Sequence, residues 1–297
     1  MGVLDELAQA TRDVAERVGP SVVGIGRGWG LGSGVVVGEG RVVTNAHNVR
    51  GGEVTVTLAD GREQSASVAG LDLDGDLAVL TADTAGTPSL EWADAPVGPG
   101  TPVFGLANPG GSGLRVTLGQ VTASGQAFRG PRGRRITGSV EHTAPLAKGS
   151  SGGPVVDAAG RLVGINTNRL GDGFYLALPA DADLRARIEA LGRGESPVGV
   201  RLGVGLASRR AARELRRAVG LPERDGLLVR AVEEDSAAAR AGIRTGDLLV
   251  EAGGRALAGV DDLHEALGGL GEGSSLGLTV VRGVEELTVT VHFEASG

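Results

Sequence analysis

Length, composition and charge set the first limits on what this chain can be. Its 297 residues allow about two domains, and the absence of cysteine excludes disulfides, a thiol nucleophile and thiolate metal sites. The net charge of −7 argues against a general nucleic-acid binder, because neutralising phosphates requires a basic surface.

The first 20 residues predict a short amphipathic helix that ends at Gly19-Pro20. Residues on one face recur at steps of three and four: Leu4, Leu7, Thr11, Val14 and Val18. A secretion signal would have a basic start and an apolar centre, which this segment lacks, and no apolar run reaches the ~18 residues of a membrane span. We therefore expect a cytoplasmic chain as the sequence stands, with the cell envelope as the alternative if a leader has been removed.

Residues 21–179 alternate short apolar runs with glycine-rich turns. The runs of strand length are SGVVVG (33–38), RVVTN (41–45), EVTVTL (53–58), LAVL (77–80), RLVGINT (161–167) and FYLALP (174–179). Many short strands without long helices are typical of a β-barrel or a sandwich. This part of the chain is therefore expected to be mainly β.

The pattern changes after Pro179, where DADLRARIEAL (181–191) predicts a helix. The polar glycine- and proline-containing stretch GRGESP (192–197) predicts a linker. Beyond it, strands are expected at 201–206, 226–232, 247–252, 275–281 and 286–293, and helices at 208–219 and 259–267. A mixture of this kind over about 100 residues indicates a small α+β domain.

One stretch, GSSGGP at 149–154, places two adjacent serines in a glycine-rich turn. A serine attacks at neutral pH only when an imidazole takes its proton, a carboxylate orients that imidazole and N–H groups face the developing oxyanion. His47 ends the strand-like TNAH, and Asp76 directly precedes the apolar LAVL. The order His, Asp, Ser is that of chymotrypsin-type proteases. Each residue alone has an ordinary structural explanation, and it is the combination that predicts catalysis.

Several motifs together resemble the HtrA/Deg family of trypsin-like serine proteases, which carry a C-terminal PDZ domain. They are GSGVVV (32–37), VVTNAHNV (42–49), DGDLAVL (74–80), GLANPGG (105–111), VTLGQVTA (116–123), KGSSGGPVVD (148–157) and LALP (176–179). The resemblance implies a chymotrypsin-like double β-barrel followed by a small α+β PDZ domain. The expected parts are an N-terminal helical segment (1–20), the protease domain (21–191), a linker (192–198) and the PDZ domain (199–297).

Matched residue by residue, the resemblance also assigns the catalytic triad. Ser151 takes the place of the serine in the family motif Gly-Asn-Ser-Gly-Gly-Pro, His47 becomes the general base and Asp76 the orienting acid. Asp72 and Asp74 compete for the last role, but only Asp76 directly precedes LAVL, as in the family motif. We expect the other two to be solvated turn residues.

The loop around the nucleophile follows the family motif less closely. The N–H groups of Gly149, Ser150 and Ser151 would form the oxyanion hole, with Ser150 standing where the family has asparagine. In the segment EHTAPLAK (141–148), Thr143 replaces an aspartate that the family usually has. The resting shape of this loop is therefore open.

The same matching predicts the pocket for the substrate residue that precedes the scissile bond. Its walls would come from Pro145 and Leu146, before the nucleophile, and from the strand carrying Leu176, Ala177 and Leu178. None of these residues is charged, and a buried carboxylate would be needed to select lysine or arginine. We expect cleavage after small or medium aliphatic residues.

In the second domain, AGIRTGD (241–247) is the stretch that most resembles a bacterial PDZ domain. Such domains add a peptide as a strand at a sheet edge and hold its terminal carboxylate with backbone N–H groups. The matching positions for that loop are Arg201, Leu202, Gly203 and Val204. Leu263 and Leu267, one helical turn apart, fit a peptide groove or the plain core equally well.

The leading hypothesis is a serine endopeptidase that cleaves unfolded or exposed polypeptide segments, with the PDZ domain binding peptide C-termini or extended segments. The alternative is a latent or inactive protease that acts as a chaperone-like peptide-binding module. We expect no metal or other cofactor, because the histidines lack metal-ligand spacing. The family resemblance implies a homotrimer, but no aromatic residue precedes Trp29, so the oligomeric state stays open.

Overall fold

The chain divides into two compact units, Met1–Ser196 and Pro197–Gly297. The computed structural model describes residues 2–26, 32–49, 51, 53–130, 135–171, 173–196, 200–207, 209–268 and 270–294. In the expected linker, residue 192 ends a helix, and residues 197 and 198 lie outside the described residues.

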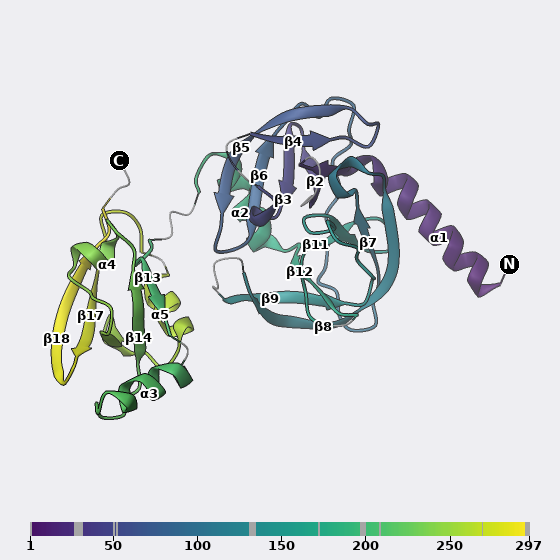
Figure 1. Cartoon of the computed structure of the whole chain (residues 1–297). Helices are drawn as coiled ribbons and strands as arrows, with labels where there is room; N and C mark the ends of the chain where they lie inside the picture. The colour runs from purple at the N-terminus through teal and green to yellow at the C-terminus, as the bar shows by residue number, and fades with distance from the viewer. Residues whose placement is uncertain are drawn as a thin grey trace. The chain divides into compact units, whose positions relative to one another are not determined.

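In its described part, the first unit forms two closed barrels of six antiparallel strands each (Figure 1). The first has the order β1-β2-β3-β6-β5-β4 and consists of β1 (Val22–Ile25), β2 (Gly32–Gly38), β3 (Arg41–Thr44), β4 (Glu53–Thr57), β5 (Glu63–Asp72) and β6 (Leu77–Thr81). The second has the order β10-β11-β12-β9-β8-β7 and consists of β7 (Pro102–Ala107), β8 (Arg115–Arg129), β9 (Arg135–His142), β10 (Pro154–Val156), β11 (Leu162–Arg169) and β12 (Tyr175–Pro179). This architecture confirms the predicted double β-barrel.

The burial of the strands follows their sequence patterns. In β4, Val54 and Val56 are buried while Glu53 is exposed, as the alternation in EVTVTL predicts. In β1 all residues are buried, because the strand is covered on both faces. The valine- and leucine-rich runs thereby close the barrels with almost no aromatic residues.

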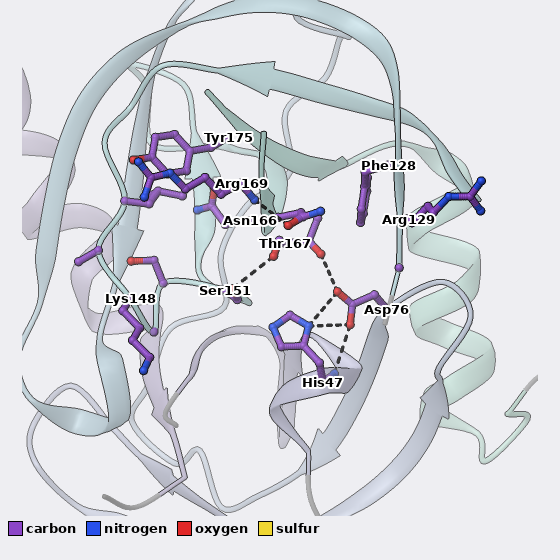
Figure 2. A pocket seen from close by; sticks show the side chains of 16 residues that line it. His47, Asp76, Phe128, Arg129, Lys148, Ser151, Asn166, Thr167, Arg169 and Tyr175 are labelled. Atoms are coloured by element: carbon purple, nitrogen blue, oxygen red, sulfur yellow. Dashed lines mark hydrogen bonds and ion pairs between the residues drawn. The ribbon is translucent and has the colours of Figure 1, made fainter. Parts of the chain in front are cut away.

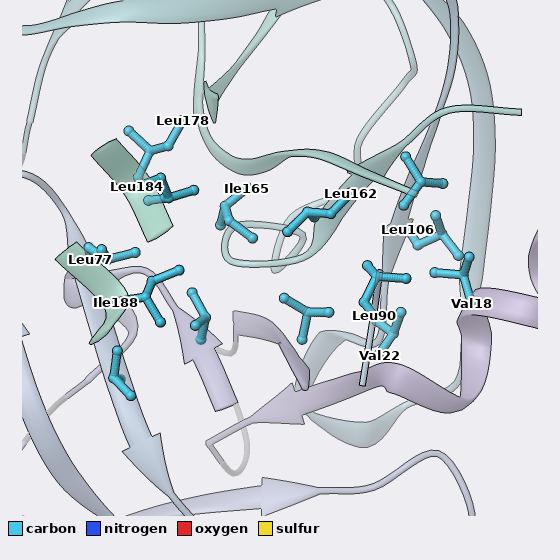
Figure 3. Packing of buried hydrophobic residues seen from close by; sticks show 14 of the residues in the cluster. Val18, Val22, Leu77, Leu90, Leu106, Leu162, Ile165, Leu178, Leu184 and Ile188 are labelled. Atoms are coloured by element: carbon cyan, nitrogen blue, oxygen red, sulfur yellow. The ribbon is translucent and has the colours of Figure 1, made fainter. Parts of the chain in front are cut away.

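A shared core joins the two barrels. Val22 and Leu77 come from the first barrel, and Leu106, Ile165 and Leu178 come from the second (Figure 3). This core fixes one barrel against the other, and with it the side chains that each contributes to a common site.

Two helices seal the same core. Helix α2 (Ala182–Gly192) inserts Leu184 and Ile188, and its N-cap Asp181 accepts a hydrogen bond from the Leu184 N–H at 2.9 Å. Helix α1 (Val3–Val18) packs with its last turns, and its N-terminal end points away from the barrels (Figure 1). The helix confirms the sequence prediction, but Leu4 is 80% exposed, so the predicted apolar face is used only in its C-terminal half.

The second unit is a small α+β domain with the strand order β13-β14-β15-β17-β18 and β16 paired to β15. Its elements are β13 (Val204–Leu206), α3 (Arg209–Ala218), β14 (Leu227–Val232), α4 (Ala237–Arg240), β15 (Leu248–Ala252), β16 (Arg255–Ala256), α5 (Val260–Leu267), β17 (Ser275–Arg282) and β18 (Glu285–His292). Asp247, the last residue of AGIRTGD, is 1% exposed and accepts hydrogen bonds at 2.8 Å from both Nε and Nη2 of Arg282. The motif therefore ties the start of β15 to β17.

None of the helices that the structure describes is both long and apolar enough to cross a membrane.

Candidate active site

His47 and Asp76 come together because the two strands that carry them are neighbours. His47 lies in the short 3-10 helix η2 (Ala46–Asn48) just after β3, Asp76 directly precedes β6, and β3 pairs with β6. The His47 Nδ1 lies 2.9 Å from Oδ1 and 3.0 Å from Oδ2 of Asp76 (Figure 2). The His47 backbone N–H also donates to Oδ1, at 3.2 Å. The carboxylate therefore fixes both the ring and the backbone of the histidine.

Asp76 is built into the structure rather than placed on its surface. It is 1% exposed, and its φ of 52° lies in the left-handed region, which non-glycine residues other than aspartate and asparagine rarely adopt. Thr167 Oγ1 donates to Oδ2 at 2.6 Å, and Asn45 Nδ2 donates to the Asp76 carbonyl at 2.9 Å. A buried carboxylate that accepts several hydrogen bonds is suited to hold an imidazole in one tautomer and to stabilise its charged form.

The competing aspartate Asp72 has a different task. It was expected to be solvated, but it is only 8% exposed. Its Oδ2 lies 2.8 Å from Arg187 Nη2 of α2. Its Oδ1 accepts the Gly75 N–H at 2.7 Å. Asp72 therefore fastens the turn before Asp76 to α2.

The nucleophile loop turns sharply at Gly149. The Ser150 N–H donates to the Ala147 carbonyl at 3.2 Å, and Gly149, the third residue of this turn, has a φ of 87°. A positive φ at that position defines a type II turn and favours glycine. Among the described residues, the N–H groups of Gly149 and Ser151 make no hydrogen bond, whereas Ser150 uses its own within the turn. Of the three N–H groups expected to form the oxyanion hole, those of Gly149 and Ser151 are thus available to an oxyanion in this conformation.

A serine of the first barrel holds this loop in place. The Ser33 N–H donates to the Ser151 carbonyl at 2.9 Å, and the Ser33 Oγ donates to the Gly149 carbonyl at 2.8 Å. The same Oγ accepts the Asn108 N–H at 3.0 Å, and Asn48 Nδ2 donates to the Ser151 carbonyl at 2.9 Å. The nucleophile of the second barrel is therefore positioned against the first barrel, which carries the histidine.

The Ser151 hydroxyl itself points to a neighbouring strand. Its Oγ donates to the Thr167 carbonyl at 3.2 Å, while the second ring nitrogen of His47 lies on the side that faces Ser151 (Figure 2). In this conformation Thr167 engages the Ser151 hydroxyl, which must turn toward His47 before it can transfer its proton.

A cavity of about 620 Å³ opens beside these residues. Of the five predicted pocket residues, Leu146 lines it, and Pro145 lines an adjoining cavity of about 300 Å³. Leu176, Ala177 and Leu178 are instead buried in the core, at no more than 2% exposure. Their strand was expected to form a wall of the pocket, but Leu176 and Leu178 pack into the core shared by the two barrels and Ala177 into a separate buried cluster on the other face of β12. The strand reaches the cavity with Tyr175.

A buried histidine lies behind this wall. His142 is fully buried, stacks on Tyr175 with ring centroids 5.9 Å apart, and its Nε2 lies 2.9 Å from Asn166 Oδ1. Because Asn166 Nδ2 donates to the carbonyls of Gly153 and Pro154, its Oδ1 is the acceptor, and His142 Nε2 carries the proton. Burial lowers the pKa of His142, against the opposing effects of the Asn166 hydrogen bond and of Glu141. Asn166 thus links a neutral histidine to the loop after Ser151.

In the second unit, the predicted carboxylate-binding residues lead into the edge strand β13. Gly203 has a φ of 77°, and an added Cβ would lie 2.2 Å from the Ser236 Cβ, so this position requires glycine. Leu202 is buried, Val204 opens β13, and Arg201 pairs with Glu233 at 3.0 Å. Leu263 belongs to the core at 3% exposure, and Leu267 packs partly against it.

Sequence reasoning missed the residues that connect the triad to its surroundings, notably Ser33, Asn166 and Thr167. All three stand in motifs that had been noted, GSGVVV and RLVGINT, as polar residues inside apolar strands. A buried polar residue needs a partner, so their position in these runs was a usable signal.

Comparisons with known proteins agree with this geometry. Residues 32–165 match the family model of the trypsin-like peptidase domain, and residues 200–293 match that of the PDZ domain. A "Probable periplasmic serine endoprotease DegP-like" of Halomonas elongata is 31% identical over 269 residues, covering 88% of this chain and 56% of the relative. A "Putative serine protease HhoB" of Synechocystis sp. is 30% identical over 281 residues, covering 90% of this chain and 67% of the relative.

Among solved structures, the HtrA-type protease AlgW with a tripeptide is similar over 97% of both chains, with 28% identity and a TM-score of 0.63. The chain spans about half the length of the first curated relatives that it matches, 56% of the Halomonas elongata protein and 52% of a Brucella suis protein.

The expectation of a cytoplasmic chain was wrong. The relatives from Halomonas elongata and Brucella suis are both named as periplasmic endoproteases, which supports a cell-envelope location instead.

Matches to both family models, together with a relative that is 30% identical and covered over 67% of its length, decide the family. The chain belongs to the HtrA/Deg family of trypsin-like serine proteases that carry a PDZ domain.

Proposed function

We propose that this chain is a serine endopeptidase of the cell envelope that cleaves unfolded or exposed polypeptide segments through an acyl-enzyme on Ser151. The observation that carries the proposal is the position of His47, whose Nδ1 lies within 3.0 Å of both oxygens of the buried Asp76. That arrangement leaves the other ring nitrogen to take a proton from Ser151.

In the reaction, the Ser151 hydroxyl turns to His47, loses its proton to the ring and attacks the substrate carbonyl. The N–H groups of Gly149 and Ser151 receive the developing negative charge. The protonated His47 then gives its proton to the leaving amine, and a water molecule hydrolyses the acyl-enzyme by the same steps. Small or medium aliphatic side chains fit the proposed pocket beside Leu146 and Tyr175.

The second unit is proposed to bind peptide C-termini or extended segments. The edge position of β13 leaves one side of that strand for a peptide, and the Gly203 turn directly precedes it. A homotrimer is also proposed, and light scattering on the purified chain would test it.

One experiment tests the enzymatic proposal and separates it from a peptide-binding module without catalysis. The wild type and the Ser151→Ala and Ser150→Ala variants are incubated with unfolded casein and, separately, with a fluorophosphonate probe. We expect cleavage and labelling to disappear in Ser151→Ala and to persist in Ser150→Ala. Loss in Ser150→Ala alone would reassign the nucleophile, and a silent wild type that still binds peptides would favour the binding module.

A further inference from the structure

The hairpin between β11 and β12 exposes two large apolar side chains beside the catalytic cavity. Leu170 is 42% exposed and Phe174 is 41% exposed, while the other aromatic side chains of the described residues are buried or half-buried. The Leu170 N–H donates to the Phe174 carbonyl at 2.9 Å, so the two residues lie opposite each other and their side chains share one face of the hairpin. We call these two side chains the hairpin patch. Exposed apolar groups next to a functional site are typical of a binding surface.

Arg169 braces this hairpin next to the cavity. Its Nε donates to the Gly171 carbonyl at 3.0 Å, and its guanidinium carbon lies 5.8 Å from the centre of the Tyr175 ring. Arg169 and Tyr175 are paired across the two strands and line the cavity beside Ser151 (Figure 2). Because successive residues of a strand point to opposite faces, the hairpin patch lies on the other face from Arg169 and Tyr175.

Strand β11 has a free edge between Ser151 and the hairpin patch. Both β10 and β12 pair with the start of β11, but from Thr167 onward its described partner is β12 alone. The Leu170 N–H points to β12, so the backbone groups of Thr167 and Arg169 point to the opposite edge. Side chains occupy that edge here: Ser151 Oγ donates to the Thr167 carbonyl at 3.2 Å, and Asn168 Oδ1 accepts the Arg169 N–H at 2.8 Å. A peptide added as a strand would replace both contacts.

The direction of β11 sets the register of such a peptide. An antiparallel strand, the more stable pairing, would run toward Ser151, so the residues that precede the scissile bond would lie along this edge. The first residue before that bond then lies opposite Thr167, and the fourth lies opposite Leu170, about 10 Å away at about 3.3 Å per residue. Opposite residues share a face, so the first and third side chains point to the cavity and the fourth points to the hairpin patch.

We propose that the enzyme selects substrates with a large apolar residue at the fourth position before the scissile bond, and that Leu170 and Phe174 bind this residue. The inference rests on the proposed endopeptidase function and adds a second specificity-determining contact to the pocket for the first residue. It also fits the proposed substrate class, because large apolar residues are mostly buried in folded proteins and become accessible in unfolded segments.

The test uses fluorogenic peptides that keep one aliphatic residue before the scissile bond and carry a single leucine, moved from the second to the sixth position. Each peptide has a partner with asparagine, which is of similar size, in place of that leucine. The ratio of kcat/KM values for leucine over asparagine measures apolar selection and cancels general effects on activity. Partial burial of a leucine on an exposed patch should give a ratio of about fivefold to twentyfold at the fourth position. At the third and fifth positions the ratio should be about one.

The variants Leu170→Asn and Phe174→Asn should each lower the ratio at the fourth position, and the double variant should bring it to about one. Leu114→Asn is the matched control, because Leu114 is a leucine of the same unit with 41% exposure that does not line the catalytic cavity. Its leucine-to-asparagine ratio should equal that of the wild type.

The same peptides are titrated into Ser151→Ala by fluorescence anisotropy, so that selection is also measured without cleavage. Tighter binding of the fourth-position leucine peptide that depends on Leu170 and Phe174, with no cleavage by the wild type, would support the inference and contradict the proposed endopeptidase. Cleavage with equal rates in every pair, a maximum at the third or fifth position, or a ratio that survives in the double variant would overturn the inference and leave the endopeptidase standing.

Discussion

Thr167 is the side chain on which the orientation of the catalytic carboxylate depends. Its Oγ1 donates at 2.6 Å to Asp76 Oδ2, the oxygen that also lies 3.0 Å from His47 Nδ1. We expect Thr167→Val, which keeps the shape and removes the donor, to lower kcat/KM by about 10- to 100-fold, since a hydrogen bond to a charged group is worth about 1.5–3 kcal/mol. Thr167→Ser should retain most of the activity. An unchanged rate of fluorophosphonate labelling in Thr167→Val would contradict this role.

His142 makes stability depend on pH. Burial lowers its pKa below the ordinary value of 6.5, and its Nδ1 has no hydrogen-bond partner among the described residues. The unfolded chain therefore binds a proton more readily than the folded chain, and stability falls as the pH drops below about 6.5, by up to about 1.4 kcal/mol per pH unit. Protonation would also place an unpaired N–H beside Tyr175.

The measurement is urea unfolding of the wild type and of His142→Gln at about pH 7.5 and pH 5. Glutamine can still donate to Asn166 but does not titrate, so this variant should lose less stability on acidification. His292→Gln, at an exposed position of β18, is the control and should behave as the wild type. Equal acid sensitivity of His142→Gln and the wild type would exclude His142 as the cause.

The nucleophile loop is an element whose shape is imposed by another barrel. Ser33→Ala would leave the Asn108 N–H and the Gly149 carbonyl without their partner, at a cost of about 1–3 kcal/mol. We expect slower labelling of Ser151, by about tenfold, because the Gly149–Ser150 peptide is no longer held. Ser139→Ala is the matched control: the Ser139 hydroxyl is also buried but has no partner in the described structure. Equal labelling rates in the two variants would contradict the clamp.

The sequence predicted elements whose signals are local. The strand β4 was predicted from its alternating side chains, and the strands β2 and β3 from their runs of valine. The catalytic triad was predicted from motifs at the ends of strands. Ser33 and Thr167 were missed because Gly149 and Asp76, to which their hydroxyls donate, lie 116 and 91 residues away in the chain. The inward orientation of Leu176 and Leu178 was missed for a related reason, since only barrel closure decides which side of β12 faces the cavity.

At the scale of the whole molecule, the change of pattern after Pro179 and the polar linker predicted two domains. The structure shows why each unit can have its own free energy of unfolding. The clusters around Leu106 and Val36 draw only on the first unit, and those around Leu249 and Leu248 only on the second. No buried residue of the described chain belongs to cores of both units. Two cores without shared residues are expected to unfold in separate transitions.

Asp247→Ala tests this separation. The substitution removes the partner of Arg282 at a site that is 1% exposed, and breaking a buried pair costs about 3–5 kcal/mol. We expect calorimetry to show two unfolding transitions, and only the midpoint temperature of the second unit should fall. At temperatures between the two transitions, Ser151 should still be labelled at the wild-type rate. Asp225→Ala, which breaks an exposed pair with Arg213 in the same unit, should shift that transition little, because surface pairs contribute about 0–1 kcal/mol. A single transition that moves as a whole, with labelling lost in parallel, would show that the two units fold as one.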